Sequence, residues 1–229
     1  MTEVDSSKGL LPAWLQNGFL SLLNPFIKLF IKWKLNPNTF TIWGLIITTV
    51  AAALLFIDRS LVNLSGALIL IGGICDILDG KVARYSNRTT KFGALFDSSV
   101  DRYSEVIMFF GIASFYVQAG DYLLSVMTFA ALGGSTMVSY VRARAEGLGF
   151  DGKIGYMQRP ERIVFIGGGA LFYFPLFRIS LFHVVDFPVT LLDIAIWVVA
   201  IFANYTAIQR IRYVYNQDKS KTVLGGNDE

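Results

Sequence analysis

The chain contains several stretches of close to 20 residues that are almost free of charge. A helix needs about 20 apolar residues to cross the hydrocarbon core of a bilayer, and such stretches have few other uses. The composition agrees, because 54% of the residues are hydrophobic and 16% are charged, against roughly 25% charged residues in a soluble domain. The sequence therefore predicts an integral membrane protein, and we expect no nucleic acid among its partners.

Hydropathy predicts an all-α fold, an integral membrane bundle of six transmembrane helices. Their expected ranges are 39–57, 61–84, 93–118, 122–146, 161–181 and 187–213. The connections between these ranges are short, which favours antiparallel neighbours in a compact bundle. Glycine pairs such as Gly72-Gly73 and Gly133-Gly134 would allow the helices to approach closely.

Ahead of the first span, residues 14–33 carry apolar side chains at helical spacing, followed by a group of lysines. This pattern predicts an amphipathic helix in the membrane interface, with Lys28, Lys32 and Lys34 near anionic headgroups. The expected organisation is an N-terminal tail and interfacial helix over 1–35, a six-helix domain over 36–215 and a polar C-terminal tail over 216–229.

Basic residues are distributed unevenly between the two expected sides of the membrane. Of the 20 Lys and Arg residues, only Arg59 and Arg178 fall at the outer ends, and the other 18 fall on the opposite side. By the positive-inside rule, the basic side faces the cytoplasm. We therefore expect a multi-pass protein of the plasma or inner membrane, with its site facing the cytoplasm.

Four aspartates stand at the ends of two neighbouring apolar stretches. Asp76 and Asp79 are three residues apart, Asp97 and Asp101 are four apart, and each pair shares a helix face. An ionised aspartate at membrane depth is costly, so it usually faces a polar cavity, pairs with another group or binds metal. Four facing carboxylates would repel one another unless cations lay between them, and hard oxygen ligands suit Mg²⁺ or Mn²⁺. The alternative is a set of salt bridges to nearby arginines, namely Arg84, Arg88 or Arg102.

Small and basic residues lie between the two aspartate pairs. Gly80 and Ala83 would leave a shallow floor for a planar base or sugar, and Arg84 could clamp a phosphate with its planar fork. The whole run reads Asp76-x2-Asp79-Gly80-x2-Ala83-Arg84-x8-Gly93-x3-Asp97-x3-Asp101. At every fixed position it resembles the signature of the CDP-alcohol phosphotransferase family, whose members have six transmembrane helices after an interfacial helix.

The resemblance implies roles for these residues. Asp76, Asp79 and Asp97 would bind metal, while Asp101 would both approach the metal and act as the general base. The CDP-activated lipid would be contacted by residues at the start of the first span and around the aspartates, namely Asn38, Thr39, Phe40, Thr41, Gly80, Ala83, Arg84, Thr90 and Gly93. The implied activity is that of an enzyme that transfers a phosphatidyl group from CDP-diacylglycerol to an alcohol and releases CMP. Members of the family are commonly homodimers.

Three arginines at the expected cytoplasmic ends of later spans bear on the identity of the alcohol. Arg142, Arg159 and Arg210 face the same compartment as the aspartates, and converging arginines suit a phosphate dianion. The runs Ser139–Glu146 and Arg159–Arg162 resemble those of phosphatidylinositol-phosphate synthases, which place basic residues at these three positions. The expected acceptor is therefore inositol 1-phosphate, and the alternative is glycerol 3-phosphate.

Two other interpretations remain open at this point. The basic residues can form a girdle that binds lipid headgroups, which is the preferred interpretation for Arg144, Arg162 and Arg212. A divalent-cation transporter would also use intramembrane acids, but it would place them near the middle of the membrane on several helices.

Overall fold

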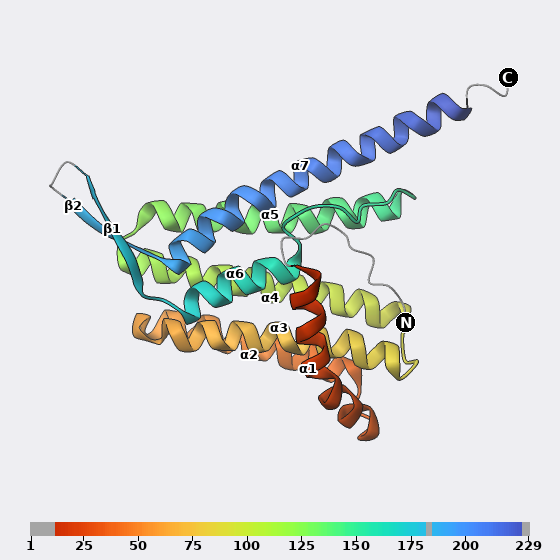
Figure 1. Cartoon of the computed structure of the whole chain (residues 1–229), viewed down its shortest axis with the longest axis horizontal. Helices are drawn as coiled ribbons and strands as arrows, with labels where there is room; N and C mark the ends of the chain where they lie inside the picture. Colours follow the sequence, from red (N-terminus) through yellow and green to blue (C-terminus); the bar gives the residue numbers. More distant parts are fainter. Residues whose placement is uncertain (1–11, 182–184, 226–229) are drawn as a thin grey trace.

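The computed structural model describes residues 12–181 and 185–225 (Figure 1). The tail predicted at 1–11, the connection at 182–184 and the last four residues lie outside the described residues. The elements in chain order are α1 (Ala13–Lys32), α2 (Pro37–Ile57), the 3₁₀ turn η1 (Arg59–Leu61), α3 (Val62–Tyr85), α4 (Lys91–Ala119), α5 (Tyr122–Gly147), α6 (Arg159–Leu171), β1 (Pro175–Leu181), β2 (Val185–Thr190) and α7 (Leu191–Gly225).

Four helical segments in the described residues are long and apolar enough to cross a membrane. They are Pro37–Ile57, Arg59–Tyr85, Tyr122–Gly147 and Leu191–Lys219. α6 has 13 residues, too few to cross a hydrocarbon core about 30 Å thick. The structure is therefore that of a mostly helical membrane protein.

The stretch predicted as a fifth span, 161–181, is not one helix. α6 ends at Leu171, and β1 then pairs with β2 in an antiparallel hairpin. Pro175 and Pro188 lie in the two strands, and proline cannot continue a helix because it lacks an N–H and clashes with the preceding turn. Hydropathy alone does not distinguish a short apolar strand from a helix. The all-α prediction is therefore corrected by one hairpin.

The final helix also differs from its predicted range. α7 begins at Leu191, after the strand, rather than near residue 187. It continues to Gly225, through most of the segment expected to be a polar tail. Thr190 and Asp193 define its start, because the Thr190 N–H donates to Asp193 Oδ2 at 2.7 Å and the Asp193 N–H donates to Thr190 Oγ1 at 3.3 Å.

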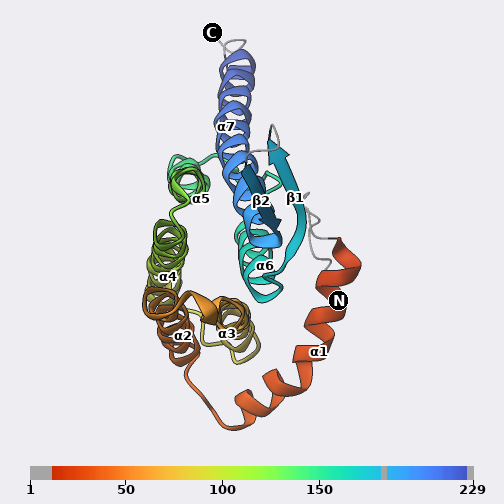
Figure 2. The same ribbon diagram turned by 90° about the vertical axis from the view of Figure 1, so that its left-hand side faces the viewer.

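The long helices lie along one general direction, with the hairpin at one end of the bundle and α7 projecting beyond the other end (Figure 1). α2 packs on α3 and α4, α5 packs on α7, and α6 lies against both α3 and α7. α1 is set to one side of the other helices (Figure 2) and contacts the bundle mainly through α3.

The core lies where these helices meet. Its fully buried side chains include Leu55, Phe109, Ile112, Ile166 and Ile196. Helices α2 and α4 approach each other closely at Gly111, where a Cβ atom would lie 2.7 Å from the Cα of Ala52. Small residues thus set the distance between α2 and α4 at this point, which holds α4 close against α2.

Candidate active site

A short turn between α3 and α4 brings the two aspartate pairs together. Asn87 has φ 54°, a left-handed conformation that asparagine tolerates better than most residues. The Thr90 side chain accepts the Gly93 N–H at 2.9 Å and caps the start of α4. The end of α3 therefore lies antiparallel to the start of α4.

Three of the four predicted metal ligands converge between these helices. Asp76, Asp97 and Asp101 each offer a carboxylate oxygen, and the three oxygens lie within 4.8 Å of one another. Asp97 Oδ1 is buried and has no hydrogen-bond partner among the described residues, a costly state for a carboxylate oxygen. Three hard oxygens, one of them without a partner, fit a divalent cation.

Asp79 lies next to this cluster but is held from another side. Asp79 is 4% exposed, and its Oδ2 accepts a hydrogen bond from Thr41 Oγ1 of α2 at 2.7 Å. The structure thus groups three of the predicted ligands and places the fourth against α2.

Arg159, the first residue of α6, lies against the cluster. Its Nη1 forms an ion pair with Asp76 and another with Asp101 Oδ2, the latter at 2.7 Å. The guanidinium therefore offsets part of the repulsion between the carboxylates.

The salt bridges considered from the sequence are not the ones that form. Arg84 Nε donates to the Gly80 carbonyl at 2.9 Å, and Arg88 donates to the Lys34 carbonyl at 3.3 Å. Arg102 pairs with Glu105 at 3.4 Å. The arginine that pairs with the aspartates comes from α6, 58 residues after Asp101 and 83 after Asp76, so local spacing could not identify it.

A cavity of about 480 Å³ opens on one side of the carboxylates. Its lining includes seven of the nine residues predicted to contact the CDP-lipid, namely Asn38, Thr41, Gly80, Ala83, Arg84, Thr90 and Gly93. The other two do not line it. Thr39 is exposed, and the Phe40 ring packs on Phe30 of α1 with 5.0 Å between centroids. The reason is helical geometry, because Asn38 and Thr41 are three apart and share a face that the two residues between them do not.

A second cavity, of about 850 Å³, opens on the other side. Arg142, Arg159 and Arg210, which the sequence grouped, all line it. Arg142 Nε is paired with Glu146 at 2.9 Å. Arg210 is 3% exposed and ties two backbones together, donating from Nε to the Ile154 carbonyl at 2.7 Å and from Nη1 to the Val138 carbonyl at 2.6 Å.

The two cavities meet at the carboxylates. Ala94 and Asp97 line both, while Asp79 lines only the smaller cavity and Asp101 only the larger. The acids thus lie at one junction between α3 and α4 and are not spread over several helices, which disfavours the transporter interpretation.

Two charged residues near the site were not identified as functional from the sequence. Arg162, interpreted as part of a lipid-binding girdle, is 0% exposed and forms an ion pair from Nε to Glu105 Oε1 at 2.6 Å. The sequence spacing of these two residues could have identified them. Glu105 follows Asp101 by one helical turn, and Arg162 follows Arg159 by three residues, so the charges recur on one face of each helix.

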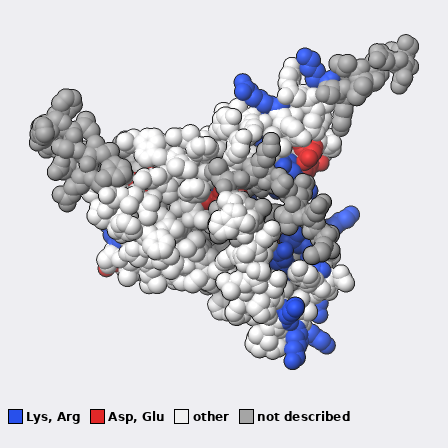
Figure 3. All heavy atoms as spheres, in the orientation of Figure 1, with Lys and Arg blue, Asp and Glu red and all other residues white. Residues whose placement is uncertain are grey.

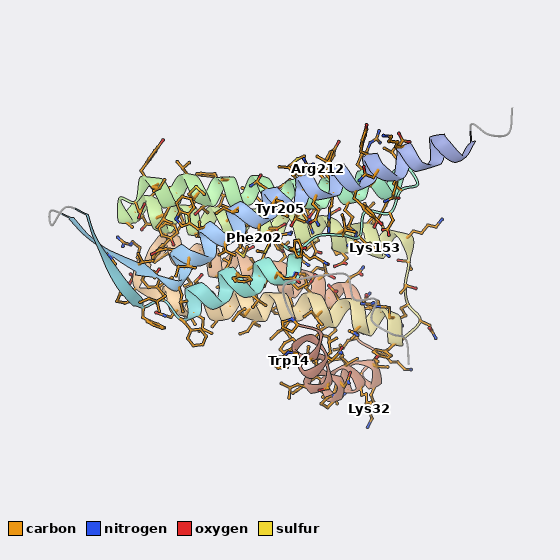
Figure 4. The ribbon with its side chains drawn as sticks, turned by 45° about the horizontal axis from the view of Figure 1, so that its top comes forward. Trp14, Lys32, Lys153, Phe202, Tyr205 and Arg212 are labelled. Carbon is orange, nitrogen blue, oxygen red and sulfur yellow. The ribbon has the colours of Figure 1, made fainter. Side chains whose placement is uncertain are left out.

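The site lies at the basic end of the molecule. Lys and Arg side chains gather at the end opposite the hairpin, over α1 and towards the far end of α7 (Figure 3). Along α7, the aromatic residues Phe202 and Tyr205 precede Arg212, which lies near this end together with Lys153 of the α5–α6 connection (Figure 4). Trp14 and Lys32 mark the two ends of α1 in the same view.

Comparison with known proteins agrees with this geometry. The family model of CDP-alcohol phosphatidyltransferases matches residues 34–204. The archaetidylinositol phosphate synthase of Methanothermobacter thermautotrophicus is 35% identical over 210 residues, covering 90% of this chain and 98% of the relative. The phosphatidylinositol phosphate synthase of Streptomyces avermitilis is 32% identical over 206 residues, covering 89% and 82%.

Solved structures similar to this one come from an enzyme of the same kind. The crystal structure of Mycobacterium tuberculosis phosphatidylinositol phosphate synthase with CDP-DAG bound has a TM-score of 0.68 and 29% identity, covering 83% of this chain and 92% of that one. A structure of the same enzyme in complex with manganese and citrate also has a TM-score of 0.68 and 29% identity, covering 83% and 88%. The chain belongs to the CDP-alcohol phosphatidyltransferase family.

Proposed function

We propose that this protein transfers the phosphatidyl group of CDP-diacylglycerol to inositol 1-phosphate, forming phosphatidylinositol phosphate and releasing CMP. The observation that carries the proposal is the junction of two cavities at the carboxylates, one lined by the nucleotide signature and the other by three arginines. A transfer between two substrates needs both reacting groups to meet at one point, and Asp97 lies where the cavities meet.

The smaller cavity is assigned to the CDP portion of the donor. Gly80 and Ala83 supply a floor without bulky side chains, and the hydrogen bond from Arg84 Nε to the Gly80 carbonyl keeps the guanidinium at the cavity wall. A planar guanidinium there suits a phosphate of the donor. The related mycobacterial enzyme was crystallised with CDP-DAG.

Asp76, Asp97 and Asp101 are assigned to a divalent ion, Mg²⁺ or Mn²⁺, with Asp79 as the adjacent fourth carboxylate. When bound, such an ion supplies positive charge beside the diphosphate and the departing CMP. Asp97 Oδ1, which has no hydrogen-bond partner in the part of the chain that the structure describes, supports this assignment, as does the manganese in the related mycobacterial structure.

The larger cavity is assigned to the acceptor. Arg142, Arg159 and Arg210 line it together, and guanidinium groups recognise a phosphate by charge-assisted hydrogen bonds. Two enzymes with more than 30% identity to this chain are named for inositol phosphate products, which favours inositol 1-phosphate over glycerol 3-phosphate.

In the proposed reaction, Asp101 accepts the proton of the attacking hydroxyl. The hydroxyl oxygen then forms a bond to the phosphorus that carries the diacylglycerol, and the bond from that phosphorus to the bridging oxygen breaks. The bridging oxygen leaves with CMP. Asp101 suits the role of general base because it lines the acceptor cavity and belongs to the carboxylate cluster.

The membrane placement is part of the proposal. We assign the basic end, with the site, to the cytoplasmic side of the plasma or inner membrane. Six helices, α2 to α7, cross or enter the bilayer, and α1 lies in the interface with exposed apolar residues such as Trp14, Leu22 and Phe26. The functional unit is a homodimer, as is common in the family.

The test is an assay of purified protein with CDP-diacylglycerol, Mg²⁺ and one acceptor at a time. Inositol 1-phosphate, glycerol 3-phosphate, inositol and serine are compared, with CMP release and the lipid product as readouts. We expect CMP release with inositol 1-phosphate and its loss when EDTA removes the metal. If CMP were released with glycerol 3-phosphate alone, the acceptor would be glycerol 3-phosphate and not inositol 1-phosphate. No CMP release with any acceptor would refute the proposed transferase activity.

A further inference from the structure

Two ion pairs connect α4 to α6 one above the other. The first joins Asp101 to Arg159 at 2.7 Å, at the carboxylate cluster. The second joins Glu105 to Arg162 at 2.6 Å, one helical turn deeper in the bundle. The second pair has no place in the proposed reaction, because Glu105 is 6% exposed and Arg162 is 0% exposed.

Arg162 contacts three separate parts of the chain. It belongs to α6, its Nε pairs with Glu105 of α4, and its Nη1 donates to the Met157 carbonyl at 3.0 Å. Met157 lies in the connection that leads into α6, two residues before Arg159, and its side chain is fully buried. A single guanidinium therefore fixes α4, α6 and the backbone that delivers Arg159 to the cluster.

The same connection is held from its other side by α7. The Met157 N–H donates to Thr206 Oγ1 at 3.2 Å, and the Ile154 carbonyl accepts from Arg210 at 2.7 Å. Both contacts come from one face of α7, since the two residues are four apart. The path of the connection is thus set by α7 on one side and by Arg162 on the other.

Stability alone does not account for a buried charge pair at this position. Taking two charges out of water costs several kcal/mol per ion, and apolar residues of similar volume often serve as well or better. Arg162 Nη2 is, in addition, buried without a hydrogen-bond partner among the described residues, which is a further cost. An apolar side chain would avoid both costs but could not hold the Met157 carbonyl.

We infer that Glu105 and Arg162 form a positioning pair that sets Arg159 for the acceptor phosphate. Arg162 borders the acceptor cavity but is 0% exposed, so the pair acts through the entry to α6 and not by direct contact with the substrate. Removing it leaves the donor cavity unchanged, since neither Glu105 nor Arg162 lines that cavity, and displaces Arg159 in the acceptor cavity. This inference rests on the proposed function, because it is tested through the KM for the proposed acceptor.

The test uses the full-length protein and measures KM separately for CDP-diacylglycerol and for inositol 1-phosphate. Arg162→Met keeps the length of the side chain but removes the charge and both hydrogen bonds. We expect the KM for inositol 1-phosphate to rise about tenfold or more, because small displacements of a positioning group are costly. The KM for CDP-diacylglycerol should stay within about twofold. Arg212→Met is the matched control, since Arg212 is exposed on α7 and away from the pair.

A second variant separates positioning from stability. Arg162→Met leaves Glu105 buried without its main partner, which lowers thermal stability, whereas Glu105→Leu combined with Arg162→Met removes both charges. We expect the double variant to regain the wild-type melting temperature while keeping the raised KM for inositol 1-phosphate, because the Met157 contact is still absent. A double variant with both the wild-type melting temperature and the wild-type KM for inositol 1-phosphate would overturn the inference. An Arg162→Met enzyme with an unchanged KM for inositol 1-phosphate would also overturn it. Wild-type protein that releases no CMP would instead refute the proposed function.

Discussion

Asp101 lies where the carboxylate cluster, the acceptor cavity and Arg159 come together. Asp101→Asn keeps the size of the side chain but removes its ability to accept a proton. We expect the rate of CMP release to fall about 100-fold or more, the usual contribution of a positioned general base. The measurement is the steady-state rate at saturating CDP-diacylglycerol and inositol 1-phosphate.

The control makes the same chemical change at the other end of the bundle. Asp58 is exposed and caps η1 by accepting the Ser60 N–H at 2.8 Å, and asparagine caps equally well. Asp58→Asn should therefore leave the rate unchanged. Full activity in Asp101→Asn would show that another group takes the proton.

Thr41 and Thr39 were both expected at the nucleotide, and the structure separates them. Thr41 donates to Asp79 and lines the smaller cavity, whereas Thr39 is exposed and does not. Thr41→Val keeps the shape but leaves Asp79 without this bond, and hydrogen bonds to charged groups contribute about 1.5–3 kcal/mol. We expect the KM for CDP-diacylglycerol to rise about tenfold in Thr41→Val and to stay unchanged in Thr39→Val. Equal effects of the two substitutions would contradict the assignment of the cavity.

At the scale of residues, local spacing predicted much of the site. The cluster forms because the aspartates recur at helical intervals on two helices joined by a short turn. Spacing could not predict the ion pair of Arg159 with Asp101 or the bond of Thr41 to Asp79, since each joins residues more than 35 positions apart. Such contacts depend on how α2 and α6 pack, which no local pattern contains.

At the scale of elements, the long apolar helices were predictable and the hairpin was not. The sequence placed helices close to α2, α3 and α5, each of which contains a long apolar run. After Leu171 the chain stays apolar but contains Pro175 and Pro188, and it forms β1 and β2 instead. The two prolines indicated that the helix could not continue, but the prediction of a span followed the hydropathy of the segment.

The docking of α1 on α3 links the first helix to the site. Leu23 and Ile27 pack on Leu78 and Val82, the residues on either side of the Asp79-Gly80-Lys81 segment. Ile27 is 2% exposed, and replacing such a residue by alanine costs about 2 kcal/mol or more. We expect Ile27→Ala to raise the population of undocked α1 about thirtyfold, since 1.4 kcal/mol corresponds to a factor of ten.

Limited trypsin digestion in detergent measures this undocking, because Lys32 and Lys34 lie at the end of α1. Cleavage there should be faster in Ile27→Ala than in wild type. Leu22→Ala is the matched control, since Leu22 is 66% exposed and does not belong to the cluster that joins α1 to α3. Equal cleavage rates in the two variants would show that α1 is not held by this contact.

At the scale of the whole molecule, charge and chemistry lie at the same end. The two cavities meet at the carboxylates where α3 and α4 come together, and the Lys and Arg side chains seen in Figure 3 gather mainly at the end opposite the hairpin (Figure 1). A phosphorylated, water-soluble acceptor must reach the site from an aqueous compartment, and the basic end attracts such anions. In the proposed placement, the basic charge that orients the protein in the membrane also favours entry of the acceptor.

This orientation predicts which loops an impermeant reagent can reach. Cys75 is the only cysteine, so a Cys75→Ser background allows single cysteines to be introduced. Asn87→Cys places a thiol in the exposed turn at the basic end, and Ser60→Cys places one in the exposed turn at the opposite end. With a membrane-impermeant maleimide, intact cells should label the Ser60→Cys variant alone, because the positive-inside rule puts residue 87 in the cytoplasm. Permeabilised cells should label both variants, which shows that each thiol is accessible.

Labelling of Asn87→Cys alone in intact cells would show the opposite orientation. It would place the carboxylates outside the compartment where CDP-activated lipids and sugar phosphates are supplied.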